Sequence, residues 1–332
     1  MDTISVGIVG VGRLGEMHAA CYREVAGARF IGVHDIDAQR GKAVAEKYGV
    51  RAFETYRQML ESVDAVNIVA PTVSHFSLAK EAMLARKHVF VEKPITVSVE
   101  EANELIALGL RQQVVLQVGH IERFNAARRA LANFPLAPMF IESHRMASFD
   151  PRGTDVAVVL DLMIHDIDII LSLVKSPLAQ VDANGVAVVS REPDIANARL
   201  KFANGCVANV TASRISQKKM RKMRLFQRDA YVSIDFLQGL SEVFRIASPE
   251  EVAGSPGFPV VLGKLEQGAS PRHIVYQKLE APEGNALKME LESFVTAICT
   301  GTAPPVTGED GRRALEVATT ITEVIRKQLV EI

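Results

Sequence analysis

"ISVGIVGVGRLGEMHAACYREV", residues 4–25, begins as an apolar strand, passes through a glycine-rich turn and continues as a helix. Gly10, Gly12 and Gly15 form the pattern G-x-G-x-x-G. In a dinucleotide-binding turn, the first glycine makes the tight turn, the second lets the backbone approach a pyrophosphate, and the third lets helix and strand pack closely. The free N–H groups at the start of the helix favour an anion. The stretch therefore predicts a dinucleotide-binding domain, with a glycine turn in a nucleotide-free α/β domain as the alternative.

The next apolar stretch, ARFIGVHD (28–35), ends in Asp35, twenty residues after Gly15. A carboxylate at this place accepts hydrogen bonds from an adenosine ribose, and it repels a 2′-phosphate. We therefore expect NAD rather than NADP as the cofactor. Arg40 is close enough in sequence to weaken that preference.

Strands and helices go on alternating to about residue 122, with strands expected at 64–71, 88–94 and 114–120. A helix should follow the capping pair Ser98 and Glu101. This alternation predicts a doubly wound parallel sheet that binds ligands at the carboxyl ends of its strands. The Lys93-Pro94 bond follows a strand end, where a cis proline is often found. Six side chains fall at or just beyond such ends: Pro71, Thr72, His75, Glu92, Lys93 and His120. A surface helix position is an equally good interpretation of His75.

The pattern changes after residue 122, so a second domain is expected, in keeping with a length of 332 residues. Alternating apolar runs, separated by turn signals such as Asn204-Gly205 and Arg228-Asp229, predict an open, mostly antiparallel meander. Residues 249–271 are rich in Gly and Pro and should form a long loop or a partner-facing excursion. Two helices, at about 285–300 and 309–328, close the chain. The sequence thus predicts an α/β protein with domains at 1–122 and 123–332.

The stretch VAVVLDLMIHDIDIILSLV, residues 156–174, is apolar enough for a membrane span but contains three aspartates and a histidine. Acids at mid-membrane cost about 2.5–3.5 kcal/mol each, so we expect a buried helix. At about 100° per residue, Asp161, His165 and Asp168 fall on one stripe roughly 60° wide. A carboxylate one turn from an imidazole suits a general base. A self-satisfied His–Asp core pair is the structural alternative, and a metal site is not expected because a clear third ligand is missing.

Composition excludes several classes of protein. The chain is 48% hydrophobic and 23% charged with a net charge of −1, so it has no electrostatic case for binding nucleic acid or an anionic membrane. No basic segment followed by an apolar one opens the sequence, so we expect no secretory signal. Cys21, Cys206 and Cys299 are scattered without metal spacing. We interpret them as reduced thiols of a cytoplasmic protein.

A nicotinamide site together with a His–Asp helix suits the oxidation of an alcohol. A base takes the hydroxyl proton while NAD⁺ takes the hydride. Lys93, just past a strand end, would hold the hydroxyl and stabilise the developing alkoxide charge.

Four segments carry a resemblance to a known family: GVGRLGEMH (10–18), APTVSH (70–75), EKP (92–94) and D-x-x-x-H-D (161–166). Over essentially its whole length the chain resembles the glucose–fructose oxidoreductase/inositol dehydrogenase family, often called Gfo/Idh/MocA. The resemblance implies a Rossmann domain followed by a substrate-binding domain whose open antiparallel sheet commonly forms homodimers or homotetramers. It implies catalytic roles for Lys93, Asp161 and His165. It implies cofactor contacts by Gly10, Gly12, Arg13, Leu14, Gly15, Asp35, Pro71, Thr72, His75, Glu92 and Lys93.

Within that family, residues 118–125, 149–169 and 212–236 resemble members that oxidise the C3 hydroxyl of UDP-N-acetylglucosamine. In lipid A pathways a partner aminotransferase then aminates the ketone. Arginine forks suit a diphosphate, although arginines near loops are as often solvated. The implied substrate contacts are His120, Glu122, Arg123, Asn125, Arg145, Arg152, Asp161 and His165. The basic run Lys218, Lys219, Arg221, Lys222 and Arg224 is more typical of a solvated sheet face than of a phosphate or oligomer contact. Ala126 and Val158-Val159 depart from the family pattern and could reshape the sugar pocket.

Two other functions stay open. The chain could oxidise another substrate, such as an inositol or a UDP-sugar in its uronic acid form, which would require an extra cation at C6. A non-catalytic, dinucleotide-sensing regulator that binds a protein partner would be expected to lack the Lys–Asp–His set. All three of these residues are present here.

Overall fold

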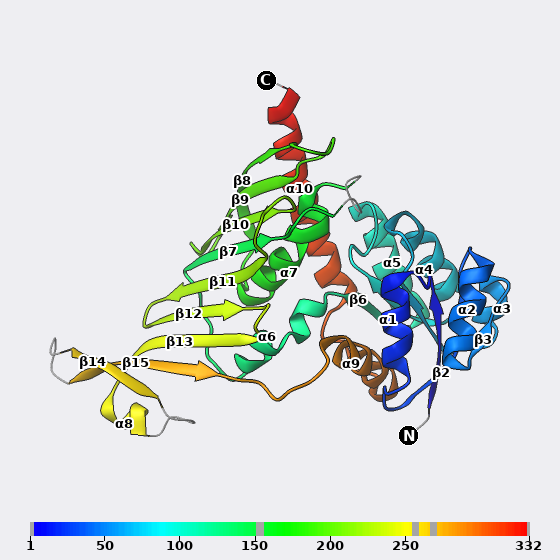
Figure 1. Cartoon of the computed structure of the whole chain (residues 1–332), viewed down its shortest axis with the longest axis horizontal. Coiled ribbons are helices and arrows are strands. Elements are labelled where there is room, and N and C mark those ends of the chain that lie inside the picture. Colours follow the sequence, from blue (N-terminus) through cyan, green and yellow to red (C-terminus); the bar gives the residue numbers. More distant parts are fainter. Residues whose placement is uncertain (1–2, 151–155, 254–258, 266–270, 331–332) are drawn as a thin grey trace. The chain divides into compact units, whose positions relative to one another are not determined.

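The computed structural model describes residues 3–150, 156–253, 259–265 and 271–330 (Figure 1). The chain forms two compact units. The first consists of residues 1–124 and 284–316, and the second of residues 125–283 and 317–332. Among the described residues, none of the helices is long and apolar enough to cross a membrane.

The first unit contains the predicted parallel sheet. Its six strands lie in the order β3-β2-β1-β4-β5-β6, and every neighbouring pair is parallel. The strand order reverses between β1 and β4, the place where doubly wound sheets bind ligands. The strands are β1 (Ile4–Val9), β2 (Ala28–His34), β3 (Arg51–Ala52), β4 (Ala65–Ile68), β5 (His88–Glu92) and β6 (Leu116–Gly119).

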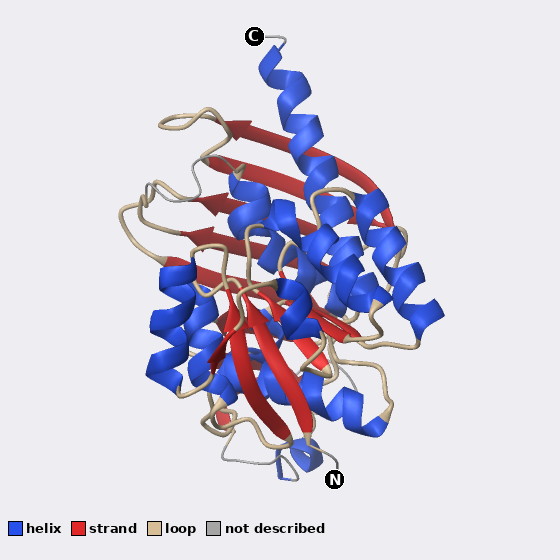
Figure 2. Cartoon of the chain, turned by 90° about the vertical axis from the view of Figure 1, so that its right-hand side faces the viewer, coloured by secondary structure: helices blue, strands red, loops and turns tan. Residues whose placement is uncertain are grey.

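Helices flank these strands (Figure 2). Their starts follow the capping rules: Asp37 accepts hydrogen bonds from two backbone N–H groups of α2, and Ser98 accepts one from Glu101 at the start of α5. The helical segments are α1 (Arg13–Tyr22), α2 (Ala38–Tyr48), α3 (Tyr56–Leu60), η1 (Thr72–Ser74), α4 (His75–Leu84), α5 (Val99–Gln112), η2 (Ile121–Phe124), α9 (Ala286–Thr300) and the first part of α10 (Gly308–Val330).

Residues 284–316 return to the first unit, which corrects a simple division at residue 122. Helix α9 covers the apolar core of the parallel sheet, where the rings of Phe90 and Phe294 meet edge to face at 5.9 Å. Gln117 on β6 donates a hydrogen bond of 3.0 Å to the carbonyl oxygen of Glu290. The sequence around α9 predicts a helix but not its partner, because the apolar face of a helix fits either sheet.

The second unit contains a nine-stranded sheet that is mostly antiparallel, as predicted. It is not a simple meander, because β7 lies between β10 and β11 and pairs with β10 in parallel. A parallel pair needs a long crossover, and the chain makes it through α7, β8 and β9. In sheet order the strands are β14 (Val260–Leu265), β15 (Arg272–Leu279), β13 (Leu240–Ala247), β12 (Ala230–Asp235), β11 (Met220–Gln227), β7 (Phe140–Met146), β10 (Val207–Ser213), β9 (Ile195–Phe202) and β8 (Leu178–Val186).

The expectation of a long loop at 249–271 is wrong for the part of it that the structure describes. Residues Pro249–Ala253 form helix α8, and Val260–Leu265 form strand β14 at the edge of the sheet. The run Val260-Val261-Leu262 has the β-branched and apolar side chains that strands favour, and it outweighs the neighbouring Gly and Pro. Residues 254–258 and 266–270 lie outside the described residues.

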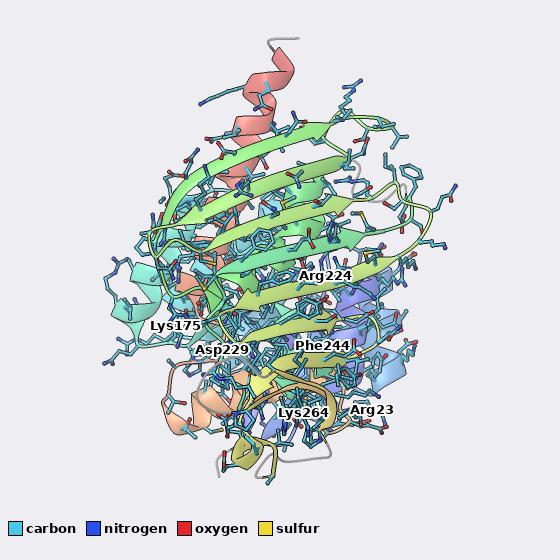
Figure 3. The ribbon with its side chains drawn as sticks, turned by 90° about the vertical axis from the view of Figure 1, so that its left-hand side faces the viewer. Arg23, Lys175, Arg224, Asp229, Phe244 and Lys264 are labelled. Atoms are coloured by element: carbon cyan, nitrogen blue, oxygen red, sulfur yellow. The ribbon has the colours of Figure 1, made fainter. Side chains whose placement is uncertain are left out.

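Helices lie on one face of the nine-stranded sheet. They are α6 (Ala126–Ala130), the π-helix η3 (Val159–Met163), α7 (Ile164–Leu173) and the rest of α10. Along β7, Ile141, Ser143 and Arg145 are buried toward this face, whereas Phe140 and Glu142 alternate with them and stay half-exposed. Figure 3 shows the opposite face, where side chains rather than helices cover the middle strands.

Candidate active site

The three glycines of the first turn do three different things. Gly10 has φ +81°, and a Cβ there would lie 2.8 Å from the backbone nitrogen of Ala70. A Cβ on Gly15 would lie 2.0 Å from the carbonyl oxygen of Gly10. At Gly12, no described atom lies within 4 Å of the same position, and no side chain caps α1. The space at Gly12 and the free N–H groups of α1 fit a pyrophosphate, so the turn suits a dinucleotide.

Asp35 follows β2 and faces this turn. Its Oδ2 accepts a hydrogen bond of 2.8 Å from the N–H of Val11, and its Oδ1 accepts one of 2.9 Å from the N–H of Asp37. Arg40 lies beside it, with Nη1 3.8 Å from Oδ1. A carboxylate has about four lone-pair positions, so Asp35 can stabilise the turn and still accept a hydrogen bond from a ribose hydroxyl.

The other predicted cofactor residues lie around the same end of the sheet. Arg13 and Leu14 are exposed in the first turn of α1. Pro71 is exposed and Thr72 is half-buried in the segment that links β4 to α4. These four residues lie just beyond the carboxyl ends of β1 and β4, where a doubly wound sheet binds its ligands.

His75 is not a surface residue, because it is only 1% exposed. Its Nδ1 lies 2.8 Å from the carbonyl oxygen of Pro94, and its Nε2 lies 2.8 Å from that of Ala70. Burial lowers the pKa of His75, against its contacts with Pro94 and Ala70 and the charge of Glu92, which raise it. His75 therefore joins the loop after β4 to the loop after β5.

Lys93 is half-buried directly after β5, and its peptide bond with Pro94 is cis, as predicted. Glu92 beside it is buried, with Oε1 3.1 Å from Nε2 of His18 and Oε2 3.2 Å from the N–H of Lys93. Burial acts to raise the pKa of Glu92, but the contacts with His18 and Lys93 outweigh it and lower that pKa. The sequence reasoning missed His18, although a histidine on the apolar side of a cofactor-binding helix is a visible signal.

The helix with the acidic residues is not uniform. Residues 159–163 form a π-helix and residues 164–173 form an α-helix. The turn that contains Asp161 is therefore wider than the regular α-helical turn that the sequence pattern predicts. Asp161 and His165 are half-buried, whereas Asp168 is 1% exposed. Single π-helical turns are frequent at functional sites, because they turn side chains away from regular α-helical positions.

Arg145 does not lie where a diphosphate could reach it. The arginine is 2% exposed and forms a two-pronged ion pair with Asp166, with Nε 2.7 Å from Oδ2 and Nη2 3.2 Å from Oδ1. This pair explains one of the acids in the apolar helix and gives Arg145 a structural role. Arg152, the other arginine expected from this part of the sequence, lies outside the described residues.

The segment after β6 supplies the remaining predicted substrate residues. His120 and Glu122 are buried, and Arg123 is half-buried with Nη2 3.6 Å from Oδ1 of Asp310. Asn125 belongs to the second unit and caps α6. Elsewhere in the described parts of the chain, as here, no group of three or more His, Cys, Asp or Glu residues is placed to hold a metal ion.

Both units of the chain match known protein families. Residues 4–120 match the family described as "Oxidoreductase family, NAD-binding Rossmann fold", and residues 119–232 match the "GFO/IDH/MocA C-terminal domain". The chain is 37% identical over 321 residues to the UDP-N-acetylglucosamine 3-dehydrogenase of Acidithiobacillus ferrooxidans, covering 96% of each chain. A solved structure of that enzyme superimposes with a TM-score of 0.85 over 98% of both chains, at 36% identity. The myo-inositol 2-dehydrogenase of Thermotoga maritima is 26% identical over 93% of this chain and 92% of its own.

Proposed function

Because the chain belongs to the GFO/IDH/MocA oxidoreductase family with its NAD-binding Rossmann fold, we propose that it oxidises the C3 hydroxyl of UDP-N-acetylglucosamine to a ketone. The observation that carries the proposal is the 37% identity with a UDP-N-acetylglucosamine 3-dehydrogenase over 96% of both chains. The inositol dehydrogenases are less similar over the same length. A nucleotide sugar is therefore favoured over a free polyol.

The first unit would bind NAD. Pyrophosphate would approach Gly12 and the N-terminus of α1, and the ribose hydroxyls would meet Asp35. NAD⁺, when bound, accepts the hydride from the sugar carbon. Glu92, Lys93 and the segment at Pro71 and Thr72 lie at the same end of the sheet and would surround the nicotinamide.

The residues of the chain would handle the proton and the charge. His165 takes the proton of the hydroxyl group, and Asp161 orients and tunes the imidazole. Lys93 donates a hydrogen bond to the same oxygen and stabilises its developing negative charge. The alternative within this proposal is that Lys93 is the base and His165 supports it.

The product of this reaction is a 3-keto sugar still attached to UDP. A ketone at C3 is the substrate that an aminotransferase needs, so the proposed partner in the pathway is an aminotransferase of the kind that supplies 2,3-diamino sugars for lipid A. The compartment proposed for the chain is the cytoplasm.

The uncovered face of the nine-stranded sheet would form the contact of a homodimer or homotetramer. Five rings follow one row across neighbouring strands, with successive centroids 4.9–5.7 Å apart: Phe140, Phe226, Tyr231, Phe244 and Tyr276. The row beside it contains charges of both signs around one serine: Glu142, Arg224, Ser233, Glu242 and Lys278. Figure 3 labels Arg224 and Phe244 on this face. Arg224 pairs with Glu142 at 3.1 Å. An apolar stripe beside charges of both signs can pair with the same surface of a second copy across a two-fold axis.

The proposal is tested by incubating the protein with NAD⁺ and a panel of UDP-N-acetylglucosamine, its uronic acid form, other UDP-sugars and free inositols. NADH absorbance is followed, with an aminotransferase or a ketone trap present to draw the reaction forward. We expect turnover with UDP-N-acetylglucosamine and little with the polyols. Turnover with an inositol but with no UDP-sugar would show that the substrate is a polyol. NAD binding without turnover of any alcohol would indicate a non-catalytic regulator.

A further inference from the structure

A chain of three polar side chains crosses the apolar core of the first unit. His18 on α1 is 0% exposed, Asn67 on β4 is 0% exposed, and Glu92 at the end of β5 is 8% exposed. Nδ2 of Asn67 lies 2.8 Å from Nδ1 of His18, and Nε2 of His18 lies 3.1 Å from Oε1 of Glu92. The ring of Phe90 meets His18 edge to face at 5.8 Å.

The neighbours of His18 set its tautomer. An asparagine Nδ2 can only donate, so Nδ1 of His18 accepts and the ring hydrogen sits on Nε2, on the side of Glu92. The contact with Glu92 is at ion-pair distance but poorly aligned for a hydrogen bond. The Nε2–H group of His18 is still directed at the carboxylate, and it favours the ionised form of that group.

Glu92 is also fixed from the other side. A Cβ on Gly119 of β6 would lie 2.8 Å from both Cδ and Oε1 of Glu92, so the glycine leaves room for the carboxylate. The ionisable groups around Glu92 are His18 on α1, Lys93 on the following turn and His75 on α4, with His120 next in sequence to Gly119. Oε2 of Glu92 accepts from the N–H of Lys93 at 3.2 Å.

We propose that His18 is a positioning residue for Lys93: it holds Glu92 as an ionised carboxylate beneath the turn that carries the lysine. This inference rests on the proposed dehydrogenase reaction. Burying a carboxylate costs several kcal/mol unless a partner compensates, so apolar side chains of similar size would stabilise the core at least as well. The polar chain is therefore better explained by the state of Lys93 than by stability. It also links α1, which begins at the cofactor turn, to the lysine that acts on the substrate.

The main test compares His18→Phe with the wild type. Phenylalanine keeps an aromatic ring beside Phe90, although a larger one, and removes the partner of Glu92. Because the contact with His18 lowers the pKa of Glu92, its loss raises that pKa, and Glu92 takes up a proton at higher pH. We expect kcat to fall by about 10-fold or more and the acid limb of the pH profile to move to higher pH, with KM for NAD nearly unchanged.

Two further variants separate positioning from loss of folding. Gly119→Ala pushes on the carboxylate of Glu92 from β6 and should move the acid limb in the same direction. His18→Gln restores a donor at roughly the same place and should recover part of kcat. The matched control is His88→Gln, because His88 lies at the opposite end of β5 and accepts a hydrogen bond from the N–H of Val115.

A measurement without substrate keeps this inference separate from the proposed function. In the protein free of cofactor, the rate at which an activated acetyl ester modifies Lys93 is followed by mass spectrometry of its peptide. Loss of the neighbouring charge increases the amine fraction, so His18→Phe and Gly119→Ala should react severalfold faster than the wild type. Unchanged Lys93 reactivity in both folded variants, or a folded His18→Phe enzyme with the wild-type acid limb, would overturn the inference. Failure of the wild type to oxidise any sugar would instead refute the function.

Discussion

The carboxylate of Asp35 accepts a hydrogen bond of 2.8 Å from the N–H of Val11, so the residue that follows β2 also holds the glycine turn between β1 and α1. The same side chain is bound by the N–H of Asp37 and lies 3.8 Å from Arg40. The residue proposed to set the cofactor preference therefore also fixes the shape of the glycine turn.

Asp35→Ala should weaken NAD binding and narrow the difference in affinity between NAD and NADP. Hydrogen bonds to a charged group contribute about 1.5–3 kcal/mol, which corresponds to roughly a 10- to 100-fold rise in Kd. Fluorescence titration with both reduced cofactors measures the effect. Arg40→Ala is the matched variant and should weaken NADP more than NAD. A wild type that binds NADP as tightly as NAD would contradict the assignment.

Lys93→Met should reduce kcat by about 100-fold or more, because the methionine cannot stabilise charge on the alkoxide oxygen. The Kd for NADH should change little. Lys87→Met is the control, since Lys87 precedes the other end of β5 and should leave both values unchanged. Turnover kinetics and cofactor titration on the same preparations decide the matter, and retention of most activity in Lys93→Met would exclude a catalytic role.

His165→Asn should reduce turnover by roughly 10²–10⁴-fold, the usual size of general-base catalysis. His165 should contribute one ionisation to the rise of the wild-type rate with pH, and the variant should lose that ionisation while it keeps the one that belongs to Glu92. Asp161→Asn keeps the shape but removes the charge, so it should also lower kcat, whereas His273→Asn should not. His165 and Lys93 titrate as a coupled pair, so the pH profile alone does not identify the base. A structure of the complex with NAD and the UDP-sugar is therefore required as well. If Lys93 alone reaches the C3 hydroxyl in that complex, the base is Lys93.

Arg145→Met should destabilise the second unit by about 3–5 kcal/mol, because it leaves Asp166 buried without its partner. The double variant Arg145→Met, Asp166→Leu should recover much of this loss, since both buried charges are then removed. Urea denaturation measures all three proteins. If the Arg145→Met variant is stable but binds UDP more weakly, Arg145 contacts the diphosphate after all.

Phe226→Asp together with Phe244→Asp should shift the protein toward monomers in sedimentation velocity experiments. The two rings belong to the row on the uncovered sheet face, and charges placed there repel each other across a two-fold axis. Leu110→Asp, on an exposed position of α5, is the control for a surface charge. An unchanged association state would show that the subunits do not associate through this face of the sheet.

The sequence predicts those parts of the fold that local pattern determines. The glycine turn, five of the six parallel strands and the helices at 286–300 and 308–330 follow from spacing, periodicity and caps, whereas the two-residue strand β3 was not expected. It does not predict the parallel pairing of β7 with β10, because register between distant strands leaves no local signal. The edge strand β14, which pairs with β15, was missed because its short apolar run stands among Gly and Pro.

For the candidate site, the sequence identified residue types better than environments. Lys93 and Glu92 lie at a strand end as expected, but Arg145, His75 and Asp166 have their polar groups bound inside the protein. A polar residue near a predicted site looks the same in sequence whether it faces a ligand or a buried partner. His18 is the converse case: the sequence shows a histidine on the apolar side of α1, but it does not show that Glu92 is its partner.

The return of residues 284–316 to the first unit has a consequence for synthesis of the chain. When residue 124 has been translated, α9 is still missing and Phe90 has no Phe294 to cover it. At about 5–20 residues per second, the ribosome needs roughly 10–30 s to reach the missing part. The sheet of the second unit, encoded in between, is complete earlier. The unfinished parallel sheet thus leaves Phe90 uncovered during translation, and a fragment ending at residue 124 should aggregate rather than fold as a free cofactor-binding module.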